Sequence, residues 1–107
     1  MIKYFSIAIS SMCPVTEELI DLRLKVHIMN AENFSKTKNE HFNLIAQVDE
    51  MDADKISHET KDKIESIRRR GAYYSIRGGN NFVRYTKSLV ELNNGLRRII
   101  AGLKINA

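Results

Sequence analysis

A seven-residue repeat near the carboxyl end is the feature that most limits how this chain can fold. Seven apolar side chains follow one another there at alternating spacings of three and four residues: Phe82, Tyr85, Leu89, Leu92, Leu96, Ile99 and Leu103. Such spacing is typical of a helix with one apolar seam, which either pairs with a second copy of the chain or forms the inner face of a monomeric core. Asn93, Asn94 and Gly95 are weak helix formers, so the helix can break near Gly95. We therefore predict a carboxy-terminal helix whose seam serves oligomerisation or the core.

A different period marks residues 20–28, where every second side chain is apolar. Strict alternation is typical of a half-buried strand. The same stretch also contains good helix formers, and a helix would align Leu19, Leu22, Val26 and Met29. We favour the strand because a helix would leave Leu24 and Ile28 on its polar side. Residues 5–9 alternate likewise, so an amino-terminal β-hairpin is predicted within residues 1–35.

Helical spacing dominates the middle of the chain. Apolar residues predict a helix over residues 38–51, and Asp54 is a candidate cap for a second helix that ends in Arg68, Arg69 and Arg70. At 107 residues the chain is expected to form a single domain. The predicted fold class is α+β, mostly α, with a β-hairpin, a helical region and a carboxy-terminal helix-turn-helix. An all-α bundle is the alternative.

Charge is distributed unevenly between the two parts of the chain. Residues 1–66 hold 8 Lys and Arg against 12 Asp and Glu, whereas residues 67–107 hold 9 Lys and Arg against a single acid, Glu91. A basic segment of this kind favours contact with nucleic acid. Alternatively, the two parts neutralise one another in the folded monomer.

A glycine pair separates two segments with helical composition in the basic region, residues 53–104. Helix, glycine-containing turn and second helix are the outline of a helix-turn-helix, with the first helix over Arg70–Arg77, the turn over Gly78–Asn80 and the second helix from Asn81. The candidates for base recognition are Asn80, Asn81, Arg84, Lys87 and Ser88. The candidates for phosphate contact are Arg68, Arg69, Arg70 and Arg77. Tyr73 and Tyr74 either stack on unpaired bases or pack against the protein.

Catalysis finds little support in the sequence. His27, His41 and His58 are scattered, and no acid or cysteine stands near them at metal-ligand spacing. We expect no enzymatic activity, no metal, no cofactor and no small-molecule substrate. The single cysteine, Cys13, favours a reducing compartment and hence the cytoplasm, and no apolar run is long enough for a membrane span.

Three stretches of residues 40–103 resemble the PapB family of adhesin (fimbrial) operon regulators. Glu40-His41-Phe42-x-Leu44-Ile45 is similar to that family's amino-terminal helix, and Asp54-Lys55-Ile56 followed by Lys61-Asp62 is similar to its next helix. Asn80-Asn81 followed by Tyr85-Thr86-x-x-Leu89-x-x-Leu92 is similar to its recognition helix. The resemblance implies a homo-oligomer that binds AT-rich DNA, with contacts in the minor groove, and that activates or represses a fimbrial operon.

The sequence thus predicts a transcriptional regulator that binds double-stranded DNA. The alternative is a small protein-binding module, such as an immunity protein or a phage inhibitor, whose acidic residues 49–65 engage a basic partner. The two differ in one observable property, because only the regulator has a salt-sensitive affinity for DNA.

Overall fold

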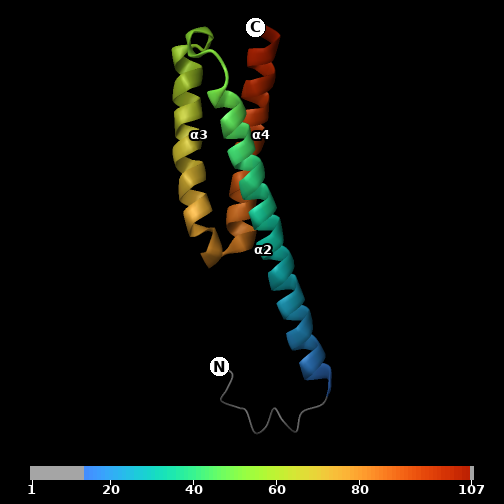
Figure 1. The fold of residues 1–107 in the computed structure, drawn as a ribbon. Coiled ribbons are helices and arrows are strands. Elements are labelled where there is room, and N and C mark those ends of the chain that lie inside the picture. Colours follow the sequence, from blue (N-terminus) through green and yellow to red (C-terminus); the bar gives the residue numbers. More distant parts are fainter. Residues whose placement is uncertain (1–13, 107) are drawn as a thin grey trace.

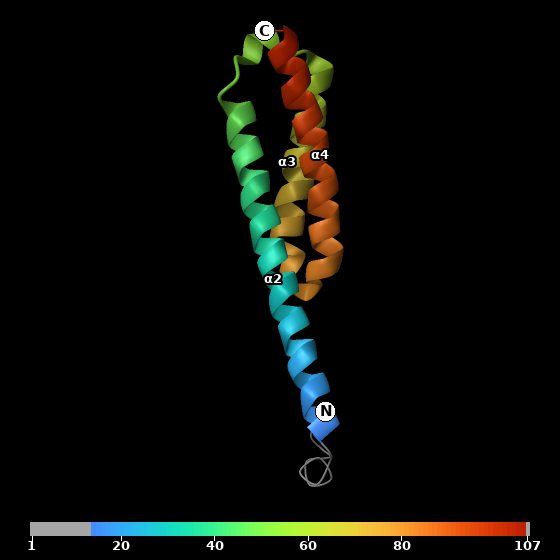
Figure 2. The ribbon, with the colours of Figure 1, turned by 90° about the vertical axis from the view of Figure 1, so that its right-hand side faces the viewer.

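The structure, a computed structural model, describes residues 14–106, and all regular elements in this range are helical. Three long helices, α2 (Pro14–Asp49), α3 (His58–Arg77) and α4 (Phe82–Asn106), are joined by two short 3-10 turns, η1 (Ala53–Lys55) and η2 (Gly78–Asn80). In Figures 1 and 2, α3 runs antiparallel to both α2 and α4. The molecule is a rod with extents of 68 × 20 × 16 Å, because α2 continues well beyond the other two helices. The α+β prediction is therefore wrong, and the fold is all-α.

Two side-chain caps set the connection between α2 and α3. The carboxylate of Asp52 accepts a hydrogen bond from the backbone N–H of Asp54 and caps η1. The hydroxyl of Ser57 accepts from the backbone N–H of Thr60 and caps α3. Each cap satisfies a backbone donor that the first turn of a helix leaves free. Asp54, the cap predicted from the sequence, lies within η1 and is the capped residue.

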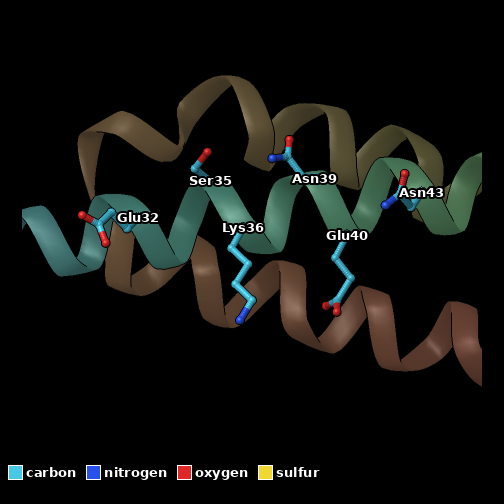
Figure 3. A pocket seen from close by; sticks show the side chains of 6 residues that line it. All are labelled: Glu32, Ser35, Lys36, Asn39, Glu40 and Asn43. Carbon is cyan, nitrogen blue, oxygen red and sulfur yellow. The ribbon is translucent and has the colours of Figure 1, made fainter.

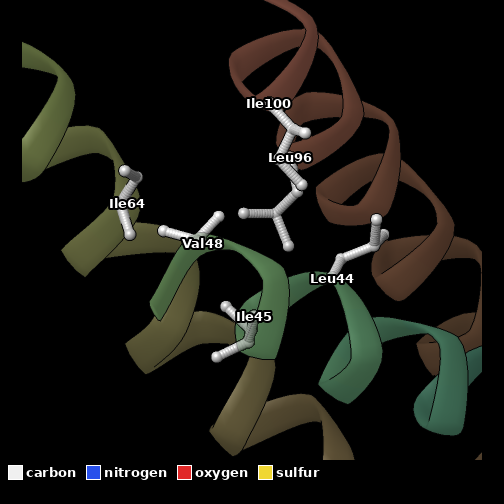
Figure 4. Close-up of a cluster of buried hydrophobic side chains, with 6 residues drawn as sticks. All are labelled: Leu44, Ile45, Val48, Ile64, Leu96 and Ile100. Atoms are coloured by element: carbon white, nitrogen blue, oxygen red, sulfur yellow. The ribbon is translucent and has the colours of Figure 1, made fainter. Parts of the chain in front are cut away.

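The three helices enclose an apolar core in two clusters. The cluster nearer the α2–α3 connection consists of Leu44, Ile45, Val48, Ile64, Leu96 and Ile100, which come from all three helices (Figure 4). The cluster nearer η2 consists of Phe34, Leu89 and Leu92, with Tyr74, Phe82 and Tyr85 packed against it. Each helix therefore buries one stripe, and the rest of its surface stays in water.

The heptad seam of α4 lies inside this core. Leu89, Leu92 and Leu96 are buried, while Phe82, Tyr85, Ile99 and Leu103 are partly buried. The helix continues through Gly95 without a break. Because Leu89, Leu92 and Leu96 already pack in the two clusters, this middle part of the seam can form an interface with a second copy only if the bundle opens.

Residues 20–28 belong to α2, so the strand predicted there is wrong. The expectation rested on Leu24 and Ile28 avoiding water, but every side chain from residue 18 to residue 29 is exposed. The alternation of apolar and polar residues therefore does not correspond to one buried face and one solvent-exposed face. The other half of the predicted hairpin, residues 5–9, lies outside the described residues.

The predicted helix-turn-helix is also corrected. Its turn does lie at Gly78–Asn80, but the preceding helix begins at His58 rather than Arg70. Helices of a helix-turn-helix cross at about 90–120°, whereas α3 and α4 lie side by side and antiparallel in both views. The unit is therefore a long helical hairpin, in which α4 packs against both α2 and α3.

Candidate nucleic-acid interface

The η2 turn fixes where α4 begins. The side-chain oxygen of Asn81 accepts a hydrogen bond from the backbone N–H of Arg84 at 3.1 Å, and the backbone N–H of Asn81 donates to the carbonyl of Gly78. Gly78 is buried against Phe34, and a Cβ atom built there would lie 1.8 Å from Cζ of that ring. Only glycine fits this approach, so the turn holds α3 and α4 in one register.

On the side away from α2, a groove runs between α3 and α4. It is lined by Lys63 and Arg70 from α3 and by Arg98 from α4, over a floor that includes Ile67 and Gly95. Because Gly95 has no side chain, the groove stays open above Ile67, whose Cδ1 would lie 3.7 Å from an added Cβ. Cations from two helices thus converge on one concave surface.

Helical periodicity extends this surface along both helices. Arg77 lies seven residues after Arg70, and Lys87 and Arg84 lie eleven and fourteen residues before Arg98. At 3.6 residues per turn these spacings are close to two, three and four whole turns, so the side chains lie along one line of each helix. We call this surface the cationic face; it consists of Lys63, Arg70, Arg77, Arg84, Lys87 and Arg98.

The cationic face carries little compensating charge. All six of its side chains are exposed. Among the described residues, Lys63 forms an ion pair with Glu59 at 3.6 Å, and no such pair is found for the other five cations. Glu91 lies on the same line of α4, one turn from Lys87, and is the acid in the middle of the face. The surface therefore retains a positive potential that polyanions can use.

Four of the predicted contact residues lie on the cationic face, namely Arg70, Arg77, Arg84 and Lys87. Lys63 and Arg98 were not predicted. Lys63 belongs to the acidic part of the sequence, but its spacing of seven residues from Arg70 and fourteen from Arg77 is a signal that could have identified it. Arg98 could have been found from its spacing to Lys87.

The other predicted phosphate contacts point elsewhere. The guanidinium of Arg68 donates to both carboxylate oxygens of Asp49 on α2, at 2.6 and 3.5 Å. This hydrogen bond is the main reason that the pKa of Arg68 is raised above its ordinary value. Arg69 is exposed, but consecutive residues on a helix are about 100° apart, so it does not share the line of Arg70. The acidic and basic parts of the sequence therefore neutralise each other at the Arg68–Asp49 pair, but not on the cationic face.

The predicted base-reading side chains are partly engaged within the chain. Asn81 caps α4, and the hydroxyl of Ser88 donates to the backbone carbonyl of Arg84 at 3.2 Å. Asn80 is exposed on the η2 turn. These contacts leave phosphate binding, rather than the reading of base edges, as the chemistry that the surface supports best.

Aromatic rings stand at the η2 end of the face. The ring centroids of Tyr74 and Tyr85 lie 5.8 Å apart across α3 and α4, and Tyr73 lies 5.8 Å from Tyr74. Arg77 lies over Tyr73 at 5.7 Å, and Arg84 lies over Tyr85 at 5.5 Å. Cation–π contacts of this kind hold the two guanidinium groups at the surface. Tyr74 and Tyr85 thus act first as packing groups, whereas Tyr73 is exposed.

A polar hollow on α2 offers no comparable chemistry. Figure 3 shows its lining along a single helix, with Lys36 and Glu40 on one side and Ser35 and Asn39 on the other, so the side chains do not converge. Glu40 is engaged by Arg97 of α4 at 2.7 Å. Within residues 14–106, no cluster of three or more His, Cys, Asp or Glu could hold a metal ion. None of the helices described is long and apolar enough to cross a membrane.

No family model, no curated protein and no solved structure matches this chain. The resemblance to the PapB family therefore stays a prediction that rests on the residues quoted for it. Tyr85, Leu89 and Leu92, which carry part of that resemblance, are packed into the core.

Proposed function

We propose that this protein binds double-stranded DNA through its cationic face. The observation that carries the proposal is the convergence of Arg70 and Arg98, from two different helices, on one groove in which neither forms an ion pair within the described residues. Cationic side chains without an acidic partner release counterions from DNA when they contact its phosphates. This release drives binding to DNA of any base sequence.

The spacing of the cations favours a stiff duplex. Lys63, Arg70 and Arg77 follow one another at seven-residue intervals, which is about 10.5 Å at 1.5 Å per residue. The major groove of B-DNA is about 12 Å wide, so cations at this spacing suit phosphates on its two edges. Because η2 and the core hold α3 and α4 rigidly together, the face suits a rigid polyanion better than a flexible single strand.

A regulatory role is proposed on the sequence resemblance and on the DNA contact together. Occupancy of a promoter by a rod of this kind would repress or activate the operon that it covers, and it would place the protein in the cytoplasm with the DNA. The face itself supplies affinity, and sequence preference then has to come from Asn80 at the turn or from DNA shape.

The acidic alternative is weaker in this structure. Asp49 is paired with Arg68, Asp52 caps η1, and Glu59 and Asp62 form local pairs with Lys63 and His58 on α3. Their carboxylates are spread over a connection and two helices. Glu50, Asp54 and Glu65 are exposed and form no ion pair within the described residues. They lie on the connection and on α3 rather than in one groove lined from two helices, so we do not propose a basic protein as the partner.

Fluorescence anisotropy with a labelled duplex tests the proposal. The affinity of the wild-type protein should fall with salt, with a log–log slope of about −0.9 for each phosphate neutralised. Replacing both groove arginines, Arg70→Ala with Arg98→Ala, should weaken binding and reduce the steepness of that slope by about 2. The control is Arg69→Ala with Lys55→Ala, which removes the same charge from outside the face and should retain the wild-type slope. Equal losses in the two double variants, or tighter binding to a single strand, would reject the proposal.

A further inference from the structure

Gly95 lies in the middle of α4, where the packing of the core does not require a glycine. Gly71 and Gly78 each face a buried ring so closely that a Cβ atom would collide with it, at 2.0 and 1.8 Å. A Cβ atom at Gly95 would make only an ordinary contact of 3.7 Å with Cδ1 of Ile67. Glycine is among the least favourable residues in a helix interior. What this glycine changes is the surface, because it leaves the groove between α3 and α4 open.

The open groove has the size and the lining of a small-molecule site. Its volume of about 410 Å³ lies within the roughly 300–1,000 Å³ that ligand pockets occupy. Its floor is apolar and consists of Ile67 from α3 with Gly95 and Ile99 from α4, and Ser66 adds a hydroxyl to the lining. The phosphates of a duplex would contact the cations of the groove and leave this floor unused. DNA binding therefore does not account for the apolar floor.

The charges of the groove select an anion. Lys63, Arg70 and Arg98 line it, and none of the described residues in the lining is acidic. Lys63 shares its charge with Glu59, whereas Arg70 and Arg98 form no ion pair within the described residues. A guanidinium group presents planar donors that match two oxygens of one phosphate. Three cations exceed what one carboxylate can neutralise, so a chain of phosphates is the better complement.

We infer that this groove binds a free nucleoside di- or triphosphate, with the base on the floor and the phosphates at Arg70 and Arg98. The faces of a base are flat and largely apolar, so a base can lie against Ile67 and Ile99 in the space that Gly95 leaves. A base stacked within a duplex cannot reach the floor, because its neighbours cover its faces. The nucleotide and DNA then compete for the same two arginines. This competition rests on the proposed function, whereas the nucleotide site itself does not.

Isothermal titration calorimetry of the full chain with ATP, in magnesium-free buffer and without DNA, tests the site. ATP should bind once per chain. Adenosine lacks the phosphates and tripolyphosphate lacks the base, so each should bind at least about tenfold more weakly than ATP. Absence of ATP binding, or equally tight binding of either fragment, would overturn the inference.

The variant Gly95→Leu fills the floor without changing any charge. Its helical circular dichroism should match the wild type, since leucine is a good helix former and the added Cβ meets Ile67 at an ordinary distance. Its ATP affinity should fall at least about tenfold. The matched control is Gly102→Leu, one heptad further along α4, which lies outside the groove and has no atom within 4 Å of its added Cβ. Undiminished ATP binding in Gly95→Leu, or an equal loss in Gly102→Leu, would contradict the site.

The variant Arg70→Gln with Arg98→Gln tests the phosphate side and leaves the floor intact. Its ATP affinity should fall to that of adenosine, because both guanidinium groups are lost. Retention of the wild-type affinity for ATP would place the phosphates elsewhere and overturn the inference. This second variant keeps the site testable if Gly95→Leu does not fold.

A competition titration separates this inference from the proposed function. With the labelled duplex, ATP should displace DNA from the wild type more effectively than tripolyphosphate at the same ionic strength. Gly95→Leu keeps every cation, so it should bind the duplex like the wild type, and ATP should displace DNA from it no better than tripolyphosphate does. A wild type that binds ATP but not the duplex retains the nucleotide site and loses the proposed function, and the reverse result does the opposite. A short single strand that binds more tightly than ATP, with its binding lost in Gly95→Leu, would assign the floor to an unpaired base of a nucleic acid and overturn the inference.

Discussion

Nδ1 of His41 lies 2.8 Å from the side-chain oxygen of Asn93, and this buried pair joins α2 to α4 between the two apolar clusters. The amide nitrogen of Asn93 donates to the backbone carbonyl of Thr37 and to Glu40. Its oxygen is therefore the acceptor, and His41 donates through Nδ1. Both residues are almost fully buried, so Nδ1 of His41 and the side-chain oxygen of Asn93 depend on each other for a hydrogen-bond partner.

Loss of the Asn93 side chain should destabilise the fold. In Asn93→Ala, the buried ring of His41 loses its partner, which costs about 1–3 kcal/mol in the free energy of unfolding. Asn94→Ala, one residue further along, removes an exposed amide and should cost clearly less. Urea denaturation followed by circular dichroism measures both. Equal stability of the two variants would show that the pair contributes nothing.

Gly71 on α3 makes room for the ring of His41. A Cβ atom at this position would lie 2.0 Å from Nε2 of the ring. Gly71→Ala should therefore destabilise the protein, by about 1–3 kcal/mol for an overpacked core. Gly102→Ala is the matched control, because nothing lies within 4 Å of its added Cβ and alanine favours a helix over glycine by about 0.5–1 kcal/mol. Thermal unfolding should thus shift in opposite directions in the two variants.

Arg68 and Arg70 are two residues apart and should behave differently. Arg68→Ala breaks a half-exposed pair with Asp49, which costs at most about 1 kcal/mol of stability, and it should leave DNA affinity nearly unchanged. Arg70→Ala should do the reverse, with unchanged stability and weaker DNA binding. Denaturation and anisotropy on the same two proteins separate the roles. A larger loss of DNA affinity in Arg68→Ala than in Arg70→Ala would place the DNA on the other side of α3.

Periodicity predicted the parts of the fold in which local spacing decides burial. The heptad spacing located α4 and its apolar seam, and the glycine pair located the turn at Gly78–Asn80. By contrast, the alternation at residues 20–28 led to a wrong prediction. A helix whose apolar side chains are exposed on opposite sides can carry the same alternating sequence pattern as a half-buried strand. The rule that apolar residues avoid water decided for the strand, and it fails here because α2 leaves these side chains exposed.

Contacts between distant residues could not be predicted from the sequence. His41 and Asn93 are 52 residues apart, and neither residue type signals a buried pair. Arg68 and Arg70 belong to one run of arginines. That Arg68 forms an ion pair with Asp49 while Arg70 lines the groove depends on the position of α2. Four of the six cations of the cationic face were predicted because basic residues concentrate in that part of the chain. Lys63 was missed because it lies in the part of the sequence in which acidic residues outnumber basic ones. Its helical spacing to Arg70 would have placed it with the other cations.

The most direct test of the central claim maps the DNA contact on the protein by an NMR titration. A short duplex is added to the isotope-labelled chain, and amide chemical shifts are followed at low and at high salt. We predict shifts along α3 and α4 around Arg70, Arg77, Lys87 and Arg98 that disappear at high salt, with little change at Leu22 or Val26 on the projecting helix. Shifts confined to α2, or no shifts at low salt, would contradict the assignment of the cationic face to DNA.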